Sequence, residues 1–256
     1  MRIALCISGQ PRNIDRGIEN ILQNMKFDFD VFMHTWWDKD SNKETFKKIL
    51  YDGSKDEVSS PMDNDWISHL YKSFDVKKMA IEEQIQLKVP KVLDDRKLKF
   101  SHTFGICSSL YSVYKCNELK RQYESENGFV YDWVIRTRSD FGMLDELNID
   151  SFDNSVIYAP NDNSHRYGFN DQFAVGSSKN MDVYCDAYPK MEEIINSHKT
   201  DIFTAPYCTQ PGNVGHEQIV QRHLENNKIK FELVDFKNYL FRDKDKRTRI
   251  HSIEDQ

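Results

Sequence analysis

The stretch Tyr131-Asp132-Trp133-Val134-Ile135-Arg136-Thr137-Arg138-Ser139-Asp140 decides the fold. Its first half is a short apolar run of aromatic and β-branched residues after the Asn127-Gly128 turn, which predicts a buried strand. Its second half, Arg136–Asp140, is termed the arginine motif below and would stand at the C-terminal end of that strand. Alternate residues of a strand point to the same side. Arg136, Arg138 and Asp140 would therefore share one face if the extended conformation continues that far.

In open α/β sheets, ligands bind at the C-terminal ends of the strands. Two guanidinium groups suit phosphate, and a carboxylate beside phosphate suits a hard divalent cation. We therefore predict a nucleotide-diphosphate site in which Arg136 and Arg138 bind the phosphates and Asp140 is the metal ligand.

The bulk properties of the chain narrow the class of protein. Its 256 residues suit one α/β domain with a substantial core. With 35 basic and 41 acidic residues the net charge is -6, and no long basic run favours binding to a nucleic acid polymer. No apolar run approaches the roughly 18 residues of a membrane span. The start of the chain lacks a signal-peptide pattern, and its 5 cysteines show no Cys-x-x-Cys spacing, so we expect a cytoplasmic protein with reduced thiols.

Periodicity predicts strands and helices in alternation. The longest helix is expected over 102–124, where apolar residues recur at three- and four-residue spacing. Helix signals cover 41–50, a variable loop is expected over 51–70, and Pro189 should split the helix after Ser178. Strands are predicted over 2–7, 29–34, 72–82, 131–140, 156–159, 171–177 and 230–234, the last as a final edge strand.

The first strand runs into Ser8-Gly9-Gln10-Pro11-Arg12, and Asn13 or Asp15 could cap the following helix. A strand, a glycine turn and a helix N-terminus form an anion site, although an ordinary strand-to-helix connection has the same pattern. His34, at the end of the second strand, could contact a phosphate or ribose or could be a structural histidine.

The order of four segments resembles that of nucleotide-sugar glycosyltransferases of the GT-A type. These segments are Ser8–Arg12, Phe29–Trp36, Arg136–Asp140 and Asn170–Phe173. The sequence is similar in particular to bacterial and viral members with Arg-x-Arg-x-Asp in place of Asp-x-Asp. The resemblance spans roughly residues 2 to 225. It implies an α/β fold: a single GT-A-like Rossmann-type domain over 1–256, with a mostly parallel central sheet flanked by helices. Residues 1–140 would form the nucleotide-binding half and 141–256 the acceptor and catalytic half.

The resemblance also implies a reaction, the transfer of a sugar from a nucleotide-diphosphate sugar to a glycan or another hydroxyl acceptor, assisted by Mn²⁺ or Mg²⁺. Because the motif offers one carboxylate where Asp-x-Asp offers two, the need for the cation stays open. Asn170 and Gln172 would contact the sugar. Glu217 is the first candidate for the catalytic base and Asp171 the second. The residues expected on the nucleotide are Ser8, Gly9, Gln10, Arg12, His34, Arg136 and Arg138.

Other interpretations remain. Glutamate is favoured in a first helical turn by the helix dipole, so Glu217 could be purely structural. A sugar nucleotidyltransferase would need a glycine-rich loop with a lysine, and residues 8–12 have one glycine and no lysine. A non-catalytic carbohydrate- or nucleotide-binding domain would have little need of Asp140. The loop 161–170 is the expected substrate loop, and the basic segment 242–249 could fold over a diphosphate.

Overall fold

The computed structural model describes residues 1–37, 65–91, 100–161, 169–197 and 215–241. It adds the backbone of 46–49 and 55–58, and of residues 100–103 it describes the backbone alone.

A seven-stranded sheet forms the centre of the protein, in the order β10-β8-β9-β6-β1-β2-β5. Strand β9 runs antiparallel to β6 and β8, and the other pairings in the sheet are parallel. This architecture confirms the predicted α/β fold class with a mostly parallel central sheet. The strands are β1 (Ile3–Gly9), β2 (Asp30–Trp36), β5 (Val76–Glu82), β6 (Trp133–Thr137), β8 (Val156–Pro160), β9 (Phe173–Gly176) and β10 (Lys230–Val234).

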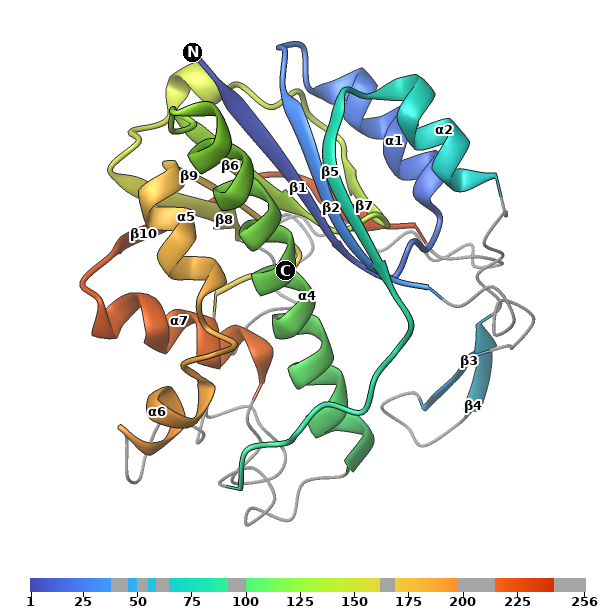
Figure 1. The fold of residues 1–256 in the computed structure, drawn as a ribbon, viewed down its shortest axis with the longest axis vertical. Helices are drawn as coiled ribbons and strands as arrows, with labels where there is room; N and C mark the ends of the chain where they lie inside the picture. Colours follow the sequence, from blue (N-terminus) through green and yellow to red (C-terminus); the bar gives the residue numbers. More distant parts are fainter. Residues whose placement is uncertain are drawn as a thin grey trace.

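Helices cover both faces of the sheet (Figure 1). One face carries α4 (Phe100–Asn127), α5 (Ser178–Cys185), α6 (Met191–Asn196) and α7 (His216–Asn226). The other carries α1 (Ile14–Asn24) and α2 (Trp66–Ser73), together with the short 3-10 turn η2 (Ile149–Ser151). Because β1 is buried on both faces, it reads as a continuous apolar run with Ala4 and Cys6 toward α4, and Leu5 and Ile7 toward α1.

Several predicted elements have the expected type. The long helix extends to 100–127, the chain after Ser178 is divided into α5 and α6 around Pro189, and β10 is an edge strand. The described cysteines, at positions 6, 107, 116 and 185, are buried thiols. In the described ranges, no helix combines the length and the apolar character needed to cross a bilayer.

The segment between β2 and β5 differs from the prediction. Strands β3 (Phe46–Ile49) and β4 (Lys55–Val58) pair antiparallel where the helix over 41–50 and the loop over 51–70 were expected. The Asp52-Gly53 dipeptide between them is a strong hairpin signal and outweighs the weak helical periodicity. Helix α2 forms because Trp66 and Leu70, four residues apart, are both fully buried. Strand β10 is not the last strand, since β11 (Asn238–Leu240) pairs with β7 (Phe141–Met143) in a separate small sheet.

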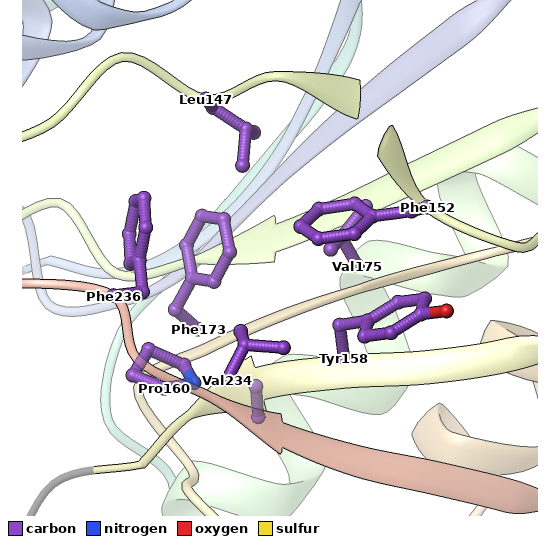
Figure 2. A pocket seen from close by; sticks show the side chains of 9 residues that line it. Leu147, Phe152, Tyr158, Pro160, Phe173, Val175, Val234 and Phe236 are labelled. Carbon is purple, nitrogen blue, oxygen red and sulfur yellow. The ribbon is translucent and has the colours of Figure 1, made fainter. Parts of the chain in front are cut away.

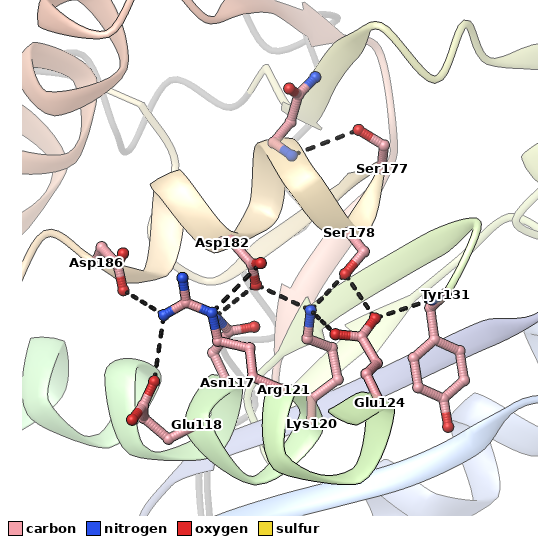
Figure 3. A network of polar contacts seen from close by, with 11 residues as sticks. Asn117, Glu118, Lys120, Arg121, Glu124, Tyr131, Ser177, Ser178, Asp182 and Asp186 are labelled. Carbon is pink, nitrogen blue, oxygen red and sulfur yellow. Dashed lines mark hydrogen bonds and ion pairs between the residues drawn. The ribbon is translucent and has the colours of Figure 1, made fainter. Parts of the chain in front are cut away.

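A buried lysine joins α4 to α5 (Figure 3). The Lys120 side chain is fully buried, and its ammonium group lies 3.0 Å from Glu124 and 2.9 Å from Asp182. Lys120 also donates to the Ser178 hydroxyl, while Glu124 accepts the backbone N–H of Tyr131 at 2.8 Å. The network therefore fixes the start of the segment that carries the arginine motif.

Candidate active site

The extended conformation ends at Thr137, one residue after the first arginine of the arginine motif. The condition under which Arg136, Arg138 and Asp140 would share one strand face is therefore not met. Arg136 lies within β6 and is buried, whereas Arg138 and Asp140 follow in a turn closed by the Phe141 N–H and the Arg138 carbonyl at 3.4 Å. The two arginines consequently meet different surroundings.

Arg136 ties the arginine motif to the loop before β9. Its guanidinium donates to the backbone carbonyl of Asp171, and within the described residues its Nε atom has no hydrogen-bond partner. Asn170 shapes the same loop, because its side-chain oxygen accepts the N–H groups of Gln172 at 2.7 Å and Phe173 at 3.3 Å. Asn170 and Gln172 are both buried. The predicted sugar-binding residues thus lie beside the predicted diphosphate residues.

The start of α7 completes this cluster. His216 Nδ1 lies 3.6 Å from the Asp171 carboxylate, and the Phe169 N–H donates to the Glu217 carbonyl at 3.3 Å. A Cβ atom at Gly215 would lie 2.7 Å from the Glu217 carboxylate, so the glycine leaves room for that side chain. The structure therefore brings both candidate bases, Asp171 and Glu217, to one place.

Arg138 and Asp140 form a two-point ion pair. Arg138 Nε donates to Asp140 Oδ1 at 2.7 Å, and Arg138 Nη2 donates to Asp140 Oδ2 at 2.8 Å. Burial favours the neutral form of Arg138, but the adjacent Asp140 outweighs it and raises the pKa of the guanidinium. Asp140 is 1% exposed and Arg138 engages both its oxygens. Among the residues that the structure describes, no three His, Cys, Asp or Glu side chains are grouped as a metal site needs. The described residues therefore hold no metal site made of protein side chains alone, and a cation shared between Asp140 and a diphosphate stays a prediction.

The turn of the arginine motif is held by the β1–α1 connection. The Ser139 hydroxyl donates to the carbonyls of Gln10 at 2.7 Å and Arg12 at 3.1 Å. Helix α1 approaches the same turn so closely that a Cβ at Gly17 would lie 2.0 Å from the Ser139 carbonyl oxygen. Only glycine permits this approach.

The end of β1 and His34 belong to a second polar group, on the α4 side. Gly9, at a φ of 114°, donates its N–H to the Ser112 hydroxyl at 2.8 Å, and the same hydroxyl lies 2.8 Å from His34 Nδ1. His34 is fully buried and its Nε2 lies 3.6 Å from the Glu82 carboxylate. Burial lowers the pKa of His34 to about 4, against the opposite effect of Glu82. Ser8 is also buried, and within the described residues its hydroxyl has no partner.

Some residues of the site carried no usable signal in the sequence. Tyr184 of α5 is 1% exposed, and within the described ranges its hydroxyl has no hydrogen-bond partner. Burial raises the pKa of Tyr184, and the charges of Arg136, Asp171 and Glu217 also act on it. Sequence periodicity marked Tyr184 only as part of an apolar helix face.

Helix α1 carries a polar stripe of which the sequence indicated only Asn13, as a candidate cap. Asn13 sits at the N-cap, but its side chain makes no capping bond. Asn20 binds the backbone of Met143 at two points, accepting its N–H at 2.7 Å and donating to its carbonyl at 2.9 Å. Asn24 also donates to that carbonyl at 3.2 Å. With Gly17, these residues recur at helical spacing and hold the chain that follows the arginine motif.

A small apolar cavity lies on the sheet face opposite Arg136 (Figure 2). Its volume is about 10 Å³, close to the lower limit for one water molecule, so it is no sugar-binding pocket. The lining residues come from β8, β9 and β10 and from three residues outside these strands, Leu147, Phe152 and Phe236.

Other predicted segments lie outside the described residues. These are most of the substrate loop 161–170 and the basic segment 242–249.

Comparison with known proteins gives a family and a distant structural likeness. A family model described as a domain of unknown function, DUF7796, matches residues 51–194, more than half of the chain. The chain belongs to this family. The segment matched to DUF7796 contains the arginine motif, the Asp171 loop and the Lys120 network.

Among curated proteins, no match was found for this DUF7796 member. The solved structures similar to it include mouse xyloside xylosyltransferase 1 in its apo form. That match has a TM-score of 0.42 and 9% identity, and covers 91% of this chain and 84% of the mouse chain. A likeness of this size carries no argument about the reaction.

Proposed function

We propose that this protein is a glycosyltransferase that transfers a sugar from a nucleotide-diphosphate sugar to a hydroxyl acceptor. The observation that carries the proposal is the position of Asp171. Its backbone carbonyl accepts from Arg136, and its carboxylate lies 3.6 Å from His216 at the start of α7. The candidate bases therefore lie beside the candidate diphosphate residues, at the C-terminal ends of the parallel strands where ligands of open α/β sheets bind.

The chemistry needs one proton acceptor and one group that neutralises the leaving diphosphate. The acceptor oxygen loses its proton to Glu217 or Asp171 and bonds to the anomeric carbon. The bond from that carbon to the diphosphate oxygen breaks, and its electron pair leaves with the diphosphate. The Arg138 side chain is 27% exposed, and we assign it the neutralisation of that charge. A divalent cation at Asp140 stays a prediction, and no step here depends on it.

Thermal stabilisation by ligands tests donor binding. The panel contains UDP-, GDP- and dTDP-linked sugars, each with Mn²⁺ or with EDTA. One nucleotide class should stabilise the wild type, and Arg138→Met should lose that shift. The matched control is Arg222→Met, because Arg222 pairs with Glu225 within α7 and is 35% exposed. The proposal fails if no nucleotide stabilises the wild type.

Turnover separates a transferase from a binding domain. Using the donor found in the panel, Glu217→Gln or Asp171→Asn should slow release of the nucleotide by on the order of 10²-fold or more while donor binding persists. Donor binding by the wild type without any turnover across a range of hydroxyl acceptors would favour the non-catalytic carbohydrate- or nucleotide-binding domain.

A further inference from the structure

The C-terminal strand reaches back to the arginine motif. After β11, the N–H of Phe241 donates to the Asp140 carbonyl at 2.8 Å. The Phe241 carbonyl in turn accepts from the Asn13 side chain at 3.1 Å. Two backbone groups of one residue thus join the end of the arginine motif to the start of α1, although Asn13 and Phe241 are 228 positions apart.

The Phe241 side chain is anchored on the same helix. The Arg16 guanidinium lies 4.4 Å from the centre of its ring, and the Tyr239 ring meets it edge-on at 4.9 Å. Phe241 is 6% exposed. Tyr239 itself packs against Gly142, where any Cβ would lie 2.5 Å from the ring. The carbonyl that Asn13 binds is therefore held at a fixed place.

Asn13 has a backbone conformation that suits this bond. Its φ is 47°, in the left-handed region that few residues other than glycine, asparagine and aspartate adopt. An asparagine at a helix N-cap normally binds an N–H of the first turn. Here the side chain makes no capping bond and donates to Phe241 instead. A strained position whose side chain serves a distant contact indicates a role beyond the helix.

We infer that Asn13 and Phe241 are positioning residues for the Arg138–Asp140 ion pair. The inference rests on the proposed function and deepens it. The Phe241 N–H fixes the Asp140 carbonyl, and with it the direction in which the Asp140 carboxylate holds Arg138 toward a diphosphate. Asn13 fixes Phe241. Neither residue needs to touch the nucleotide.

Two variants separate this role from general stability. Asn13→Gly keeps the left-handed conformation and removes the amide, and Phe241→Ala removes the ring but keeps both backbone groups. The control is Asn127→Gly, because Asn127 also donates to a backbone carbonyl, that of Tyr123 at 2.8 Å, but at the far end of α4. We call the two hydrogen bonds of Phe241, to Asp140 and from Asn13, the latch. Hydrogen exchange of the 238–241 amides measures how firmly the latch is closed. Dissociation constants for UDP, GDP and dTDP measure the effect on nucleotide binding.

Asn13→Gly should speed exchange in 238–241 and weaken nucleotide binding about fivefold, the effect of one lost hydrogen bond. Phe241→Ala should weaken binding as well, whereas Asn127→Gly should leave both readouts unchanged. Unchanged exchange in Asn13→Gly would overturn the latch, and faster exchange with unchanged dissociation constants would overturn the positioning role. A wild type that binds none of the three nucleotides would refute the proposed function and with it the positioning role, while the exchange data would still decide the latch.

Discussion

Replacing Lys120 by Met should destabilise the protein severely. The side chain is fully buried and lies 3.0 Å from Glu124 and 2.9 Å from Asp182. Met fills most of the same volume, so the loss is electrostatic: Glu124, with 9% side-chain exposure, loses this cation, and Asp182, with 25%, keeps Arg121 at 3.3 Å. Removing one partner of a buried ion pair costs about 3–5 kcal/mol. That is a large part of the roughly 5–15 kcal/mol that stabilises a typical domain.

The assay is urea unfolding at pH 7, with Arg121→Met as the matched control. Arg121 also pairs with Asp182, at 3.3 Å, but it is 38% exposed, so its loss should cost less than about 1 kcal/mol. Burial lowers the pKa of Lys120, but Asp182 and Glu124 outweigh it and the pKa is raised. A group with a raised pKa contributes its full stabilisation below its unfolded pKa, about 10.4 for lysine, and loses it only as the pH rises through the folded value. At pH 7 the whole contribution is therefore present.

A second variant tests the electrostatic cause. Adding Glu124→Gln and Asp182→Asn to Lys120→Met removes both negative charges that faced the ammonium group and keeps their hydrogen-bond acceptors, so the triple variant should regain much of the lost stability. Equal losses for Lys120→Met and Arg121→Met, or a triple variant less stable than the single one, would refute this reasoning.

Three further perturbations address the site. Gly17→Ala places a Cβ 2.0 Å from a backbone carbonyl of the arginine motif and should cost roughly 1–3 kcal/mol in the free energy of unfolding, whereas Gly105→Ala, with open space around it, should cost nothing. Gly215→Ala meets only the flexible end of Glu217 at 2.7 Å, so we expect unchanged thermal stability but slower turnover. The pKa of His34 is about 4 in the folded protein and about 6.5 in the unfolded chain, so the unfolded state binds the proton first as the pH falls. The free energy of unfolding should therefore decrease by roughly 2 kcal/mol between pH 7 and pH 5. Urea unfolding at both pH values, compared with His34→Gln, measures that slope, and equal slopes would contradict the burial of this histidine.

The central sheet was predictable because its inner strands, such as β1 and β6, are buried on both faces. Such strands need continuous apolar runs, and the runs at 2–7 and 131–137 stand out from a chain rich in charge. The hairpin of β3 and β4 was missed because its four-residue strands are too short for periodicity to separate strand from helix, and only Asp52-Gly53 marked the turn.

The site was predictable in its residue types and not in its geometry. Whether Arg136 and Arg138 share a face depends on where the strand ends, and strand ends are set by tertiary contacts. In this protein the contacts of Ser139 with Gln10 and Arg12 bend the chain directly after Thr137. The partners of Ser139 are backbone carbonyls, which every residue type has. These contacts therefore cannot be predicted from residue types.

The bend gives the two arginines different tasks. Arg136 donates to the backbone carbonyl of Asp171 and so joins β6 to the loop before β9. Arg138 and Asp140 form a pair that is neutral as a unit. A diphosphate gains full attraction only when Arg138 turns away from Asp140 or when a further positive charge joins the pair. Binding that persists in EDTA and is lost in Arg138→Met would therefore mean that the guanidinium does the work of a metal ion. Binding that needs Mn²⁺ would mean that the cation supplies the further positive charge, since the Asp140 oxygens have lone pairs beyond those that Arg138 engages.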